Sequence, residues 1–186
     1  QMCIRDRYLA STEKRVRDRA IRSLAAFVLM RAQEGGLSMS PAELSKLWKG
    51  LFYCFWMSDK PLVQQQLAQE LSELVLMVAG IDTRSDEAQV ASLRHALAAL
   101  DFYQGFWHTM QAEWLGVDKF RIDKYYLLMR RFLQAGCQLL LVYGCDALLV
   151  ERYVHIMRGT DGPLSSNNVH VPDSITYHIC DAFLAE

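Results

Sequence analysis

The sequence is poor in the residues that interrupt or cross-link a chain. Its 186 residues include only four prolines and ten glycines, which excludes a collagen-like or low-complexity protein. Five cysteines form no Cys-x-x-Cys pair and leave an odd number, so their spacing supports neither a disulfide framework nor a zinc site. The longest uncharged run, residues 132–145, is too short to span a membrane. Because 52% of the residues are hydrophobic and 22% are charged, we expect a folded domain rather than a disordered chain.

Motifs of the common enzyme classes are also absent. The sequence contains no GxxxxGKS/T, no GxGxxG after a strand, no HExxH and no GxSxG. Cys54 lies in an apolar run without a neighbouring base, which favours a buried structural cysteine over a nucleophile. For His170 and His178, which flank the last predicted loop, exposed or packing roles are favoured over metal binding. We therefore predict that the protein is not an enzyme and has no catalytic, cofactor-binding or metal-binding residues and no cofactor.

Apolar residues at helical spacing dominate the first half of the sequence. A first helix is predicted over 13–31, followed by a glycine pair at 35–36 that ends it. A second begins at Ser40, where Ser-Pro-Ala-Glu supplies an N-cap, a proline at the first helical position and the glutamate of a capping box. Asp59 is predicted to cap a third helix, which ends at Gly80.

The second half continues this pattern. Its helices are predicted to span 85–116, with a bend near 101–105, then 118–139 and 146–157, and a last helix follows a loop at 159–172. Ser85, Asp118 and Asp173 are predicted to begin three of these helices.

Seven predicted helices without a convincing strand indicate an all-α protein. The helices pair into antiparallel hairpins of about 40 to 50 residues, the size of HEAT or armadillo units. We therefore predict a HEAT/armadillo-like α-solenoid of antiparallel helix pairs, and a closed bundle is the alternative. We interpret residues 1–8 as a non-native leader and residues 9–186 as a single α-helical domain truncated at the C-terminus.

Aromatic residues gather in two segments, 51–57 and 102–114. Exposed rings in these segments would stack on nucleic-acid bases, whereas buried rings would join the helix–helix core. The rings recur at helical spacing, which favours the core.

The net charge of −1 conceals basic and acidic segments that alternate along the chain. The net charges are +5 for residues 1–31, 0 for 32–58, −5 for 59–116, +3 for 117–131 and −4 for 132–186. If the first and fifth predicted helices expose their cations on one surface, that surface would bind RNA or an acidic partner. The alternative is ordinary solvated helix faces with intrahelical pairs, such as Asp118 with Arg121 or Lys124.

The candidate RNA-binding or partner-binding residues come from these two basic segments. They are Arg15, Arg17, Arg19, Arg22, Lys119, Arg121, Lys124, Arg130 and Arg131.

Three strings of residues carry a family resemblance. They are RDRAIR at 17–22, WKGLFYCFWMSDKPLVQQ at 48–65 and FWHTMQAEWLGVDKFRIDKYYLLMRRFL at 106–133, and residues 171–184 match more weakly. Two of these strings are long and rich in tryptophan. Over about residues 13–186 the chain resembles the N-terminal domain of the ribosomal RNA-processing protein 1 family, a group of eukaryotic nucleolar factors.

The resemblance implies a non-catalytic ribosome-biogenesis factor that acts in pre-rRNA processing and large-subunit assembly within pre-ribosomal particles. It implies a location in the nucleus and nucleolus, and partners among the proteins of the pre-ribosomal particle and the pre-rRNA. Neither a membrane nor a small-molecule substrate is expected. The alternative is a protein-only interaction solenoid, with RNA binding confined to the basic tail of the family, which this sequence does not include.

Overall fold

Seven α-helices follow one another in the computed structural model, which describes residues 14–33, 39–81 and 92–185. They are α2 (Lys14–Gln33), α3 (Pro41–Trp56), α4 (Pro61–Val78), α5 (Leu93–Glu113), α6 (Ile122–Val142), α7 (Ala147–Arg158) and α8 (Asp173–Ala185), with a 3-10 helix, η1 (Trp114–Gly116), after α5. None of the described residues is in a β-strand. The prediction of an all-α fold is confirmed.

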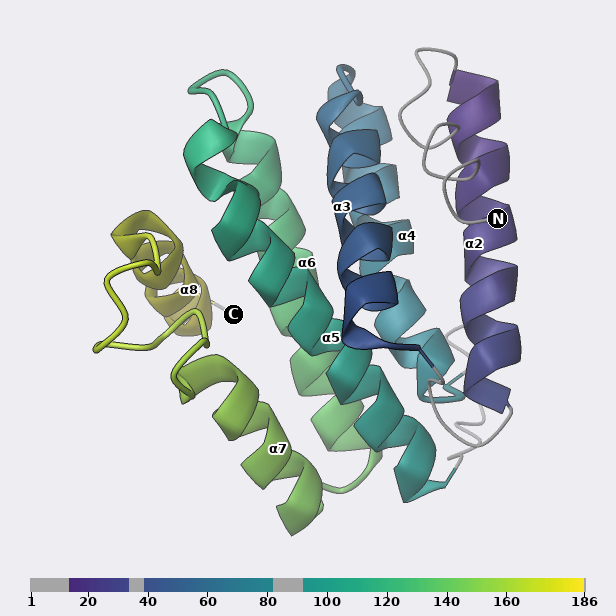
Figure 1. The fold of residues 1–186 in the computed structure, drawn as a ribbon, viewed down its shortest axis with the longest axis vertical. Coiled ribbons are helices and arrows are strands. Elements are labelled where there is room, and N and C mark those ends of the chain that lie inside the picture. Colours follow the sequence, from purple (N-terminus) through teal and green to yellow (C-terminus); the bar gives the residue numbers. More distant parts are fainter. Residues whose placement is uncertain (1–13, 34–38, 82–91, 186) are drawn as a thin grey trace.

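The helices alternate between two layers. Helices α3, α5 and α7 pack in one layer, and α2, α4, α6 and α8 pack in the other, so each helix contacts its second neighbour along the chain. Figure 1 shows α3 and α5 in front of α4 and α6, with α2 and α8 at opposite edges. Because the array stays open at these edges, it is a HEAT/armadillo-like α-solenoid of antiparallel helix pairs rather than a closed bundle.

Local signals place several helix ends where they were predicted. The Ser40 hydroxyl accepts a hydrogen bond from the Glu43 backbone N–H, and the Glu43 carboxylate accepts one from the Ser40 backbone N–H, which completes the capping box. Gly80 adopts a φ of 74° directly after α4, a conformation that glycine adopts without strain. The Asp146 carboxylate caps α7 by accepting hydrogen bonds from the N–H groups of Leu148 and Leu149.

Two predicted caps are wrong. Asp59 lies one residue too early, because extended Lys60 is the N-cap of α4 and makes no side-chain capping bond, while Pro61 holds the first helical position. Asp118 accepts a hydrogen bond from the Phe120 N–H and so caps a turn, and α6 begins only after it. The predicted helix over 85–116 is also wrong in its first part, because Ser92 is extended and α5 begins at Leu93. Ser85 itself and the glycine pair at 35–36 lie outside the described residues.

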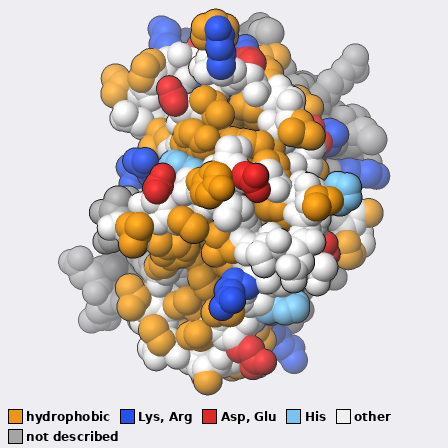
Figure 2. All heavy atoms as spheres, turned by 90° about the vertical axis from the view of Figure 1, so that its left-hand side faces the viewer, with side chains coloured by type: hydrophobic (Ala, Val, Ile, Leu, Met, Phe, Trp, Pro, Cys, Tyr) orange, Lys and Arg blue, Asp and Glu red, His pale blue; other side chains and the backbone are white. Residues whose placement is uncertain are grey.

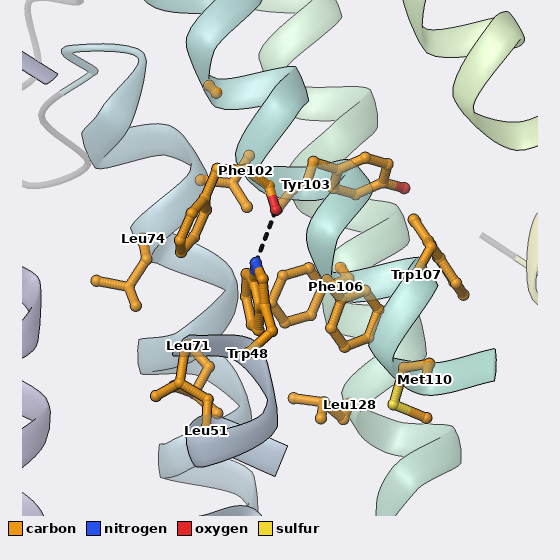
Figure 3. Packing of buried hydrophobic residues seen from close by; sticks show 14 of the residues in the cluster. Trp48, Leu51, Leu71, Leu74, Phe102, Tyr103, Phe106, Trp107, Met110 and Leu128 are labelled. Atoms are coloured by element: carbon orange, nitrogen blue, oxygen red, sulfur yellow. Dashed lines mark hydrogen bonds between the residues drawn. The ribbon is translucent and has the colours of Figure 1, made fainter. Parts of the chain in front are cut away.

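Trp48 of α3 lies at the centre of the core (Figure 3). Its indole N–H donates a 2.9 Å hydrogen bond to the Phe102 carbonyl oxygen of α5. Its ring centroid lies 4.6 Å from that of Phe102 and 5.4 Å from that of Phe132 in α6. One side chain therefore connects three helices and both layers.

Gly105 allows this close approach of α3 and α5. A Cβ atom built at this position would lie 2.6 Å from the Trp48 ring and 2.9 Å from Leu44. Helix α5 runs without interruption through residues 101–105, and Gly105 serves the close packing of α5 on α3.

The two aromatic segments join the core, as their helical spacing predicts. The rings of Phe106 and Phe132 stack with centroids 3.7 Å apart, and Tyr125 stacks on Phe52 at 4.7 Å. Cys54 of α3 is fully buried, as the apolar run around it predicts. Among the described helices, none is both long and apolar enough to cross a membrane.

Several large apolar side chains are exposed at the α7 and α8 end of the solenoid. Figure 2 shows hydrophobic side chains over much of this side of the molecule, with charged groups of both signs scattered among them. The large apolar side chains that α7 and α8 leave exposed are Leu148, Val154, Tyr177, Phe183 and Leu184.

Helix α8 packs on α6 through a buried histidine. The His178 imidazole stacks on Tyr126 with ring centroids 4.0 Å apart, and its Nε2 lies 3.0 Å from the Tyr126 carbonyl oxygen. Burial lowers the pKa of His178 below the ordinary value of 6.5, and the Arg130 charge lowers it further. The contact with the Tyr126 carbonyl oxygen and the Asp181 charge raise the pKa, but by less. His178 therefore packs between α6 and α8, whereas His170 is exposed. The described residues hold no group of three or more metal-ligand side chains.

The Gly105→Ala variant tests the helix contact. Because the added methyl group would overlap Trp48, we expect the free energy of unfolding to fall by about 1–3 kcal/mol. Urea denaturation followed by tryptophan fluorescence measures this change. Gly116→Ala is the matched control, because no atom lies within 4 Å of a Cβ built there. Equal stability of the two variants would contradict this account of the α3–α5 contact.

The lowered pKa of His178 predicts that stability depends on pH. Since its pKa is lower in the folded state, the folded protein disfavours protonation, so stability is retained above pH 6.5 and lost as pH falls through the lowered pKa. We expect the urea midpoint to fall between pH 7.5 and pH 5 more steeply for the natural chain than for His178→Gln. Identical slopes would show that other groups cause the dependence.

Candidate binding surface

The basic residues of α2 lie at one edge of the solenoid. The side chains of Arg15 and Arg19 are exposed and lie one helical turn apart, on the same face. Arg17 and Arg22 belong to the same helix, but their side chains are outside the described part of the structure. Helix α2 packs against α4, which separates it from the second basic segment.

Lys124 is not a surface cation. Its side chain enters the core beside the end of α3 and leaves the residue 6% exposed. Its Nζ donates hydrogen bonds of 2.7 Å to the carbonyl oxygens of both Trp56 and Ser58. The expected exposure of this candidate residue is therefore wrong, because the ammonium group caps the C-terminus of a neighbouring helix.

The surroundings of Lys124 also change its acidity. Burial, together with the nearby Arg121 charge, lowers the pKa of Lys124 to about 8, although Asp59 and Asp118 act in the opposite direction. The ammonium also lies 5.7 Å from the centre of the Phe55 ring, a cation–π contact.

Arg121, like Lys124, contacts the end of α3. Its guanidinium lies 4.6 Å from the Trp56 ring centre and forms an ion pair with the Asp118 carboxylate. The predicted local pair of Asp118 with Arg121 is therefore confirmed. Together Arg121 and Lys124 fasten the start of α6 to the turn between α3 and α4.

The remaining candidates of the second basic segment differ in exposure. Lys119 and Arg130 are exposed, and the Lys119 ammonium lies 5.0 Å from the centre of the Phe120 ring. Arg131 is half-buried and donates a hydrogen bond to Gln134 within α6. Lys119 and Arg130 are thus the cations of this segment that extend into solvent.

Helix α4 lies between the two basic groups in its layer. It contains no lysine or arginine, and its exposed face carries glutamines and glutamates. Two of these glutamates accept hydrogen bonds from glutamines four residues earlier, Gln66 to Glu70 and Gln69 to Glu73. The structure therefore brings the two basic segments into one layer but keeps them as two separate groups.

A groove on the opposite layer was missed in the sequence. It has a volume of about 620 Å³ and runs between α3 and α5, and Arg152 of α7 lines one of its sides. Two ion pairs border it, Lys49 with Glu113 and Arg152 with Asp101, each 2.7 Å long. Since each pair joins residues more than 50 positions apart, no local spacing could have revealed it.

Comparison with known sequences identifies the family. Residues 6–186 match the sequence family described as the nucleolar protein Nop52. The chain belongs to the Nop52 family. The resemblance carried by residues 48–65 and 106–133 is thereby confirmed.

Several relatives of this Nop52 chain carry a common name. This chain is 35% identical over 178 residues to ribosomal RNA processing protein 1 homolog A of Homo sapiens. The aligned region covers 96% of this chain and 35% of the human protein. Homolog B of Mus musculus is 37% identical over 179 residues, covering 96% of this chain and 22% of the mouse protein. The ribosomal RNA processing protein 1 homolog of Drosophila melanogaster is 33% identical over 183 residues, and the aligned region covers 97% of this chain and 23% of the fly protein. The chain thus spans about a fifth to a third of the length of these relatives.

The Lys124→Met variant tests whether this residue is structural. Because methionine fills the space but donates no hydrogen bond to the Trp56 and Ser58 carbonyl groups, we expect a loss of about 1–3 kcal/mol of stability. Arg130→Met removes an exposed cation of the same helix and should change stability by less than about 0.5 kcal/mol. Urea denaturation compares the two variants, and an unchanged midpoint for Lys124→Met would refute the capping role.

Proposed function

We propose that this chain is a non-catalytic ribosome-biogenesis factor acting in pre-rRNA processing and large-subunit assembly. In this proposal it works in nucleolar pre-ribosomal particles, as a helical scaffold for pre-rRNA and assembly factors. Membership of a nucleolar protein family and relatives named for ribosomal RNA processing support the proposal. The α-solenoid supports the scaffold role, because stacked helix pairs present a long surface without requiring a catalytic centre.

The exposed cations of α2 and of the 117–131 segment are the proposed RNA contacts. Arg15 and Arg19 form one group, and Lys119 and Arg130 form the other. Exposed guanidinium and ammonium groups bind phosphates with release of counterions, which makes the affinity fall steeply with salt. Arg121 and Lys124 contribute by positioning the start of α6 rather than by contacting phosphate, since both are engaged within the fold.

The placement of α4 favours a second candidate function, a protein-only interaction solenoid. Its glutamine and glutamate face separates the two basic groups, so among the described side chains no continuous basic surface joins α2 to the 117–131 segment. In this alternative, RNA binding belongs to a basic segment elsewhere in a longer protein, and the solenoid binds assembly factors alone.

RNA binding by the chain distinguishes the two functions. We expect binding to single-stranded RNA at low salt. The slope of the logarithm of the binding constant against the logarithm of the salt concentration should become shallower by about 0.7 for each phosphate contact that is lost. The variant Arg15→Glu with Arg19→Glu should therefore bind more weakly and with a shallower slope. Lys46→Glu is the matched control, because Lys46 is an exposed cation on α3 in the other layer.

Two outcomes would contradict the RNA contact. One is the absence of binding at low salt, and the other is an equal loss in the Lys46→Glu control. Nuclease-resistant association with purified assembly factors, together with either outcome, would support the protein-only function.

A further inference from the structure

The groove between α3 and α5 lies on the layer opposite to the basic groups. Its floor includes small residues of α5, among them Gly105 and Ala112, and Leu44 of α3 lies along one side. At Gly105 the two helices approach closely, because Trp48 and Leu44 of α3 occupy the space that a side chain there would take. The groove runs along this contact.

The two ion pairs give the groove charges of opposite sign at its ends. Asp101 and Glu113 are twelve residues apart on α5, which corresponds to roughly 18 Å along the helix axis. Near Glu113 the more exposed partner is Lys49, whose side chain is 57% exposed against 18% for the glutamate. At the other end the more exposed partner is Asp101, whose side chain is 56% exposed against 31% for that of Arg152. A ligand in the groove therefore meets an ammonium group at one end and a carboxylate at the other.

The pairs also hold these groups in place. The Arg152 guanidinium donates to both Asp101 and Gln104, at 2.7 and 2.8 Å. The Glu113 carboxylate accepts a hydrogen bond from the Tyr53 hydroxyl in addition to its contact with Lys49. Each end of the groove is thus built from three side chains of two helices, and a ligand would not have to order them.

The length of the groove sets the length of a ligand that reaches both charged ends, which lie roughly 18 Å apart along α5. An extended peptide covers the same length with about five residues, at about 3.3 Å per residue.

The charge of the groove favours a peptide over RNA. Its four ionised side chains, Lys49, Arg152, Asp101 and Glu113, sum to zero, and two of them are carboxylates that would repel a phosphate backbone. A peptide that carries one acidic and one basic side chain satisfies both ends.

We infer that this groove binds an extended segment of about five residues from a partner protein, with an acidic side chain on Lys49 and a basic side chain on Asp101. Small apolar residues between them lie over Gly105 and Ala112. The inference rests on the proposed scaffold function and assigns a partner chemistry to one of its surfaces.

A charge swap within the groove tests this inference. In the variant Lys49→Glu with Glu113→Lys, the ion pair is retained but the exposed charge at that end changes from positive to negative. The probe is a capped pentapeptide with glutamate at one end, arginine at the other and alanine or leucine between, used in both directions. Binding is followed by NMR shifts of the Gly105 and His108 amides.

The natural chain should bind the mixed-charge peptide, and the swapped variant should bind it at least tenfold more weakly. The swapped variant should instead prefer a pentapeptide with arginine at both ends. Absence of groove shifts with either direction of the mixed-charge peptide would overturn the inference, and so would equal binding of both peptides by the swapped variant. Groove shifts with a uridine hexanucleotide but not with the peptide would assign the groove to RNA and also overturn it.

A second variant avoids dependence on the ion pairs. Ala112→Trp fills the groove from an exposed position, so the fold should be retained and peptide binding should be lost. Retained peptide affinity in this variant would contradict the site. The same variant should bind RNA as the natural chain does, so a failure of the groove is separable from a failure of the RNA contacts on α2 and on the 117–131 segment.

Discussion

The contact between Trp48 and the backbone of α5 is the constraint from which the other features of the fold follow. A buried indole N–H needs an acceptor, and the Phe102 carbonyl oxygen provides one at 2.9 Å. That bond is compatible with the ring packing only because Gly105 has no side chain. The spacing of α3 and α5 therefore depends on the Trp48–Phe102 hydrogen bond and on the absence of a side chain at Gly105. The Phe106–Phe132 stack then carries this arrangement into α6 and the second layer.

The charged residues of the chain divide into those that build the fold and those that face solvent. Lys124 and Arg121 belong to the first kind, because they satisfy carbonyl groups and an aromatic face at the end of α3. Lys119 and Arg130 belong to the second. A basic segment in the sequence is thus no measure of a basic surface, and the binding role proposed for this family member rests on fewer cations than the composition indicates. The two layers also differ in character, since the exposed cations of α2 and of the 117–131 segment lie on one and a groove of zero net charge lies on the other.

Features that depend on neighbouring residues could be predicted from the sequence. The capping box of Ser40 and Glu43, the glycine at the end of α4 and the Asp146 cap each involve groups within four positions of one another. The apolar stripes likewise indicated helices and, from their spacing, buried aromatic rings. The errors at Asp59 and Asp118 are also local, because a proline moved one N-cap by one residue and a tight turn moved the other by three. Family membership was readable from the long tryptophan-rich strings, whose residues are those that occupy the core and the α5–α6 connection.

The partners and the exposure of the long charged side chains could not be predicted from neighbouring residues. Lys124 donates to a carbonyl group 68 positions away, and Arg152 reaches Asp101 across 51. A lysine on a helix faces solvent or covers the end of another helix according to which helix lies beside it, and no pattern within its own helix contains that information. The same holds for the groove, which exists because α3 and α5 meet at Gly105 and because α7 supplies Arg152. The sequence thus specified the helices, their apolar faces and the family, whereas the packing of distant helices selected which charges remain available to a partner.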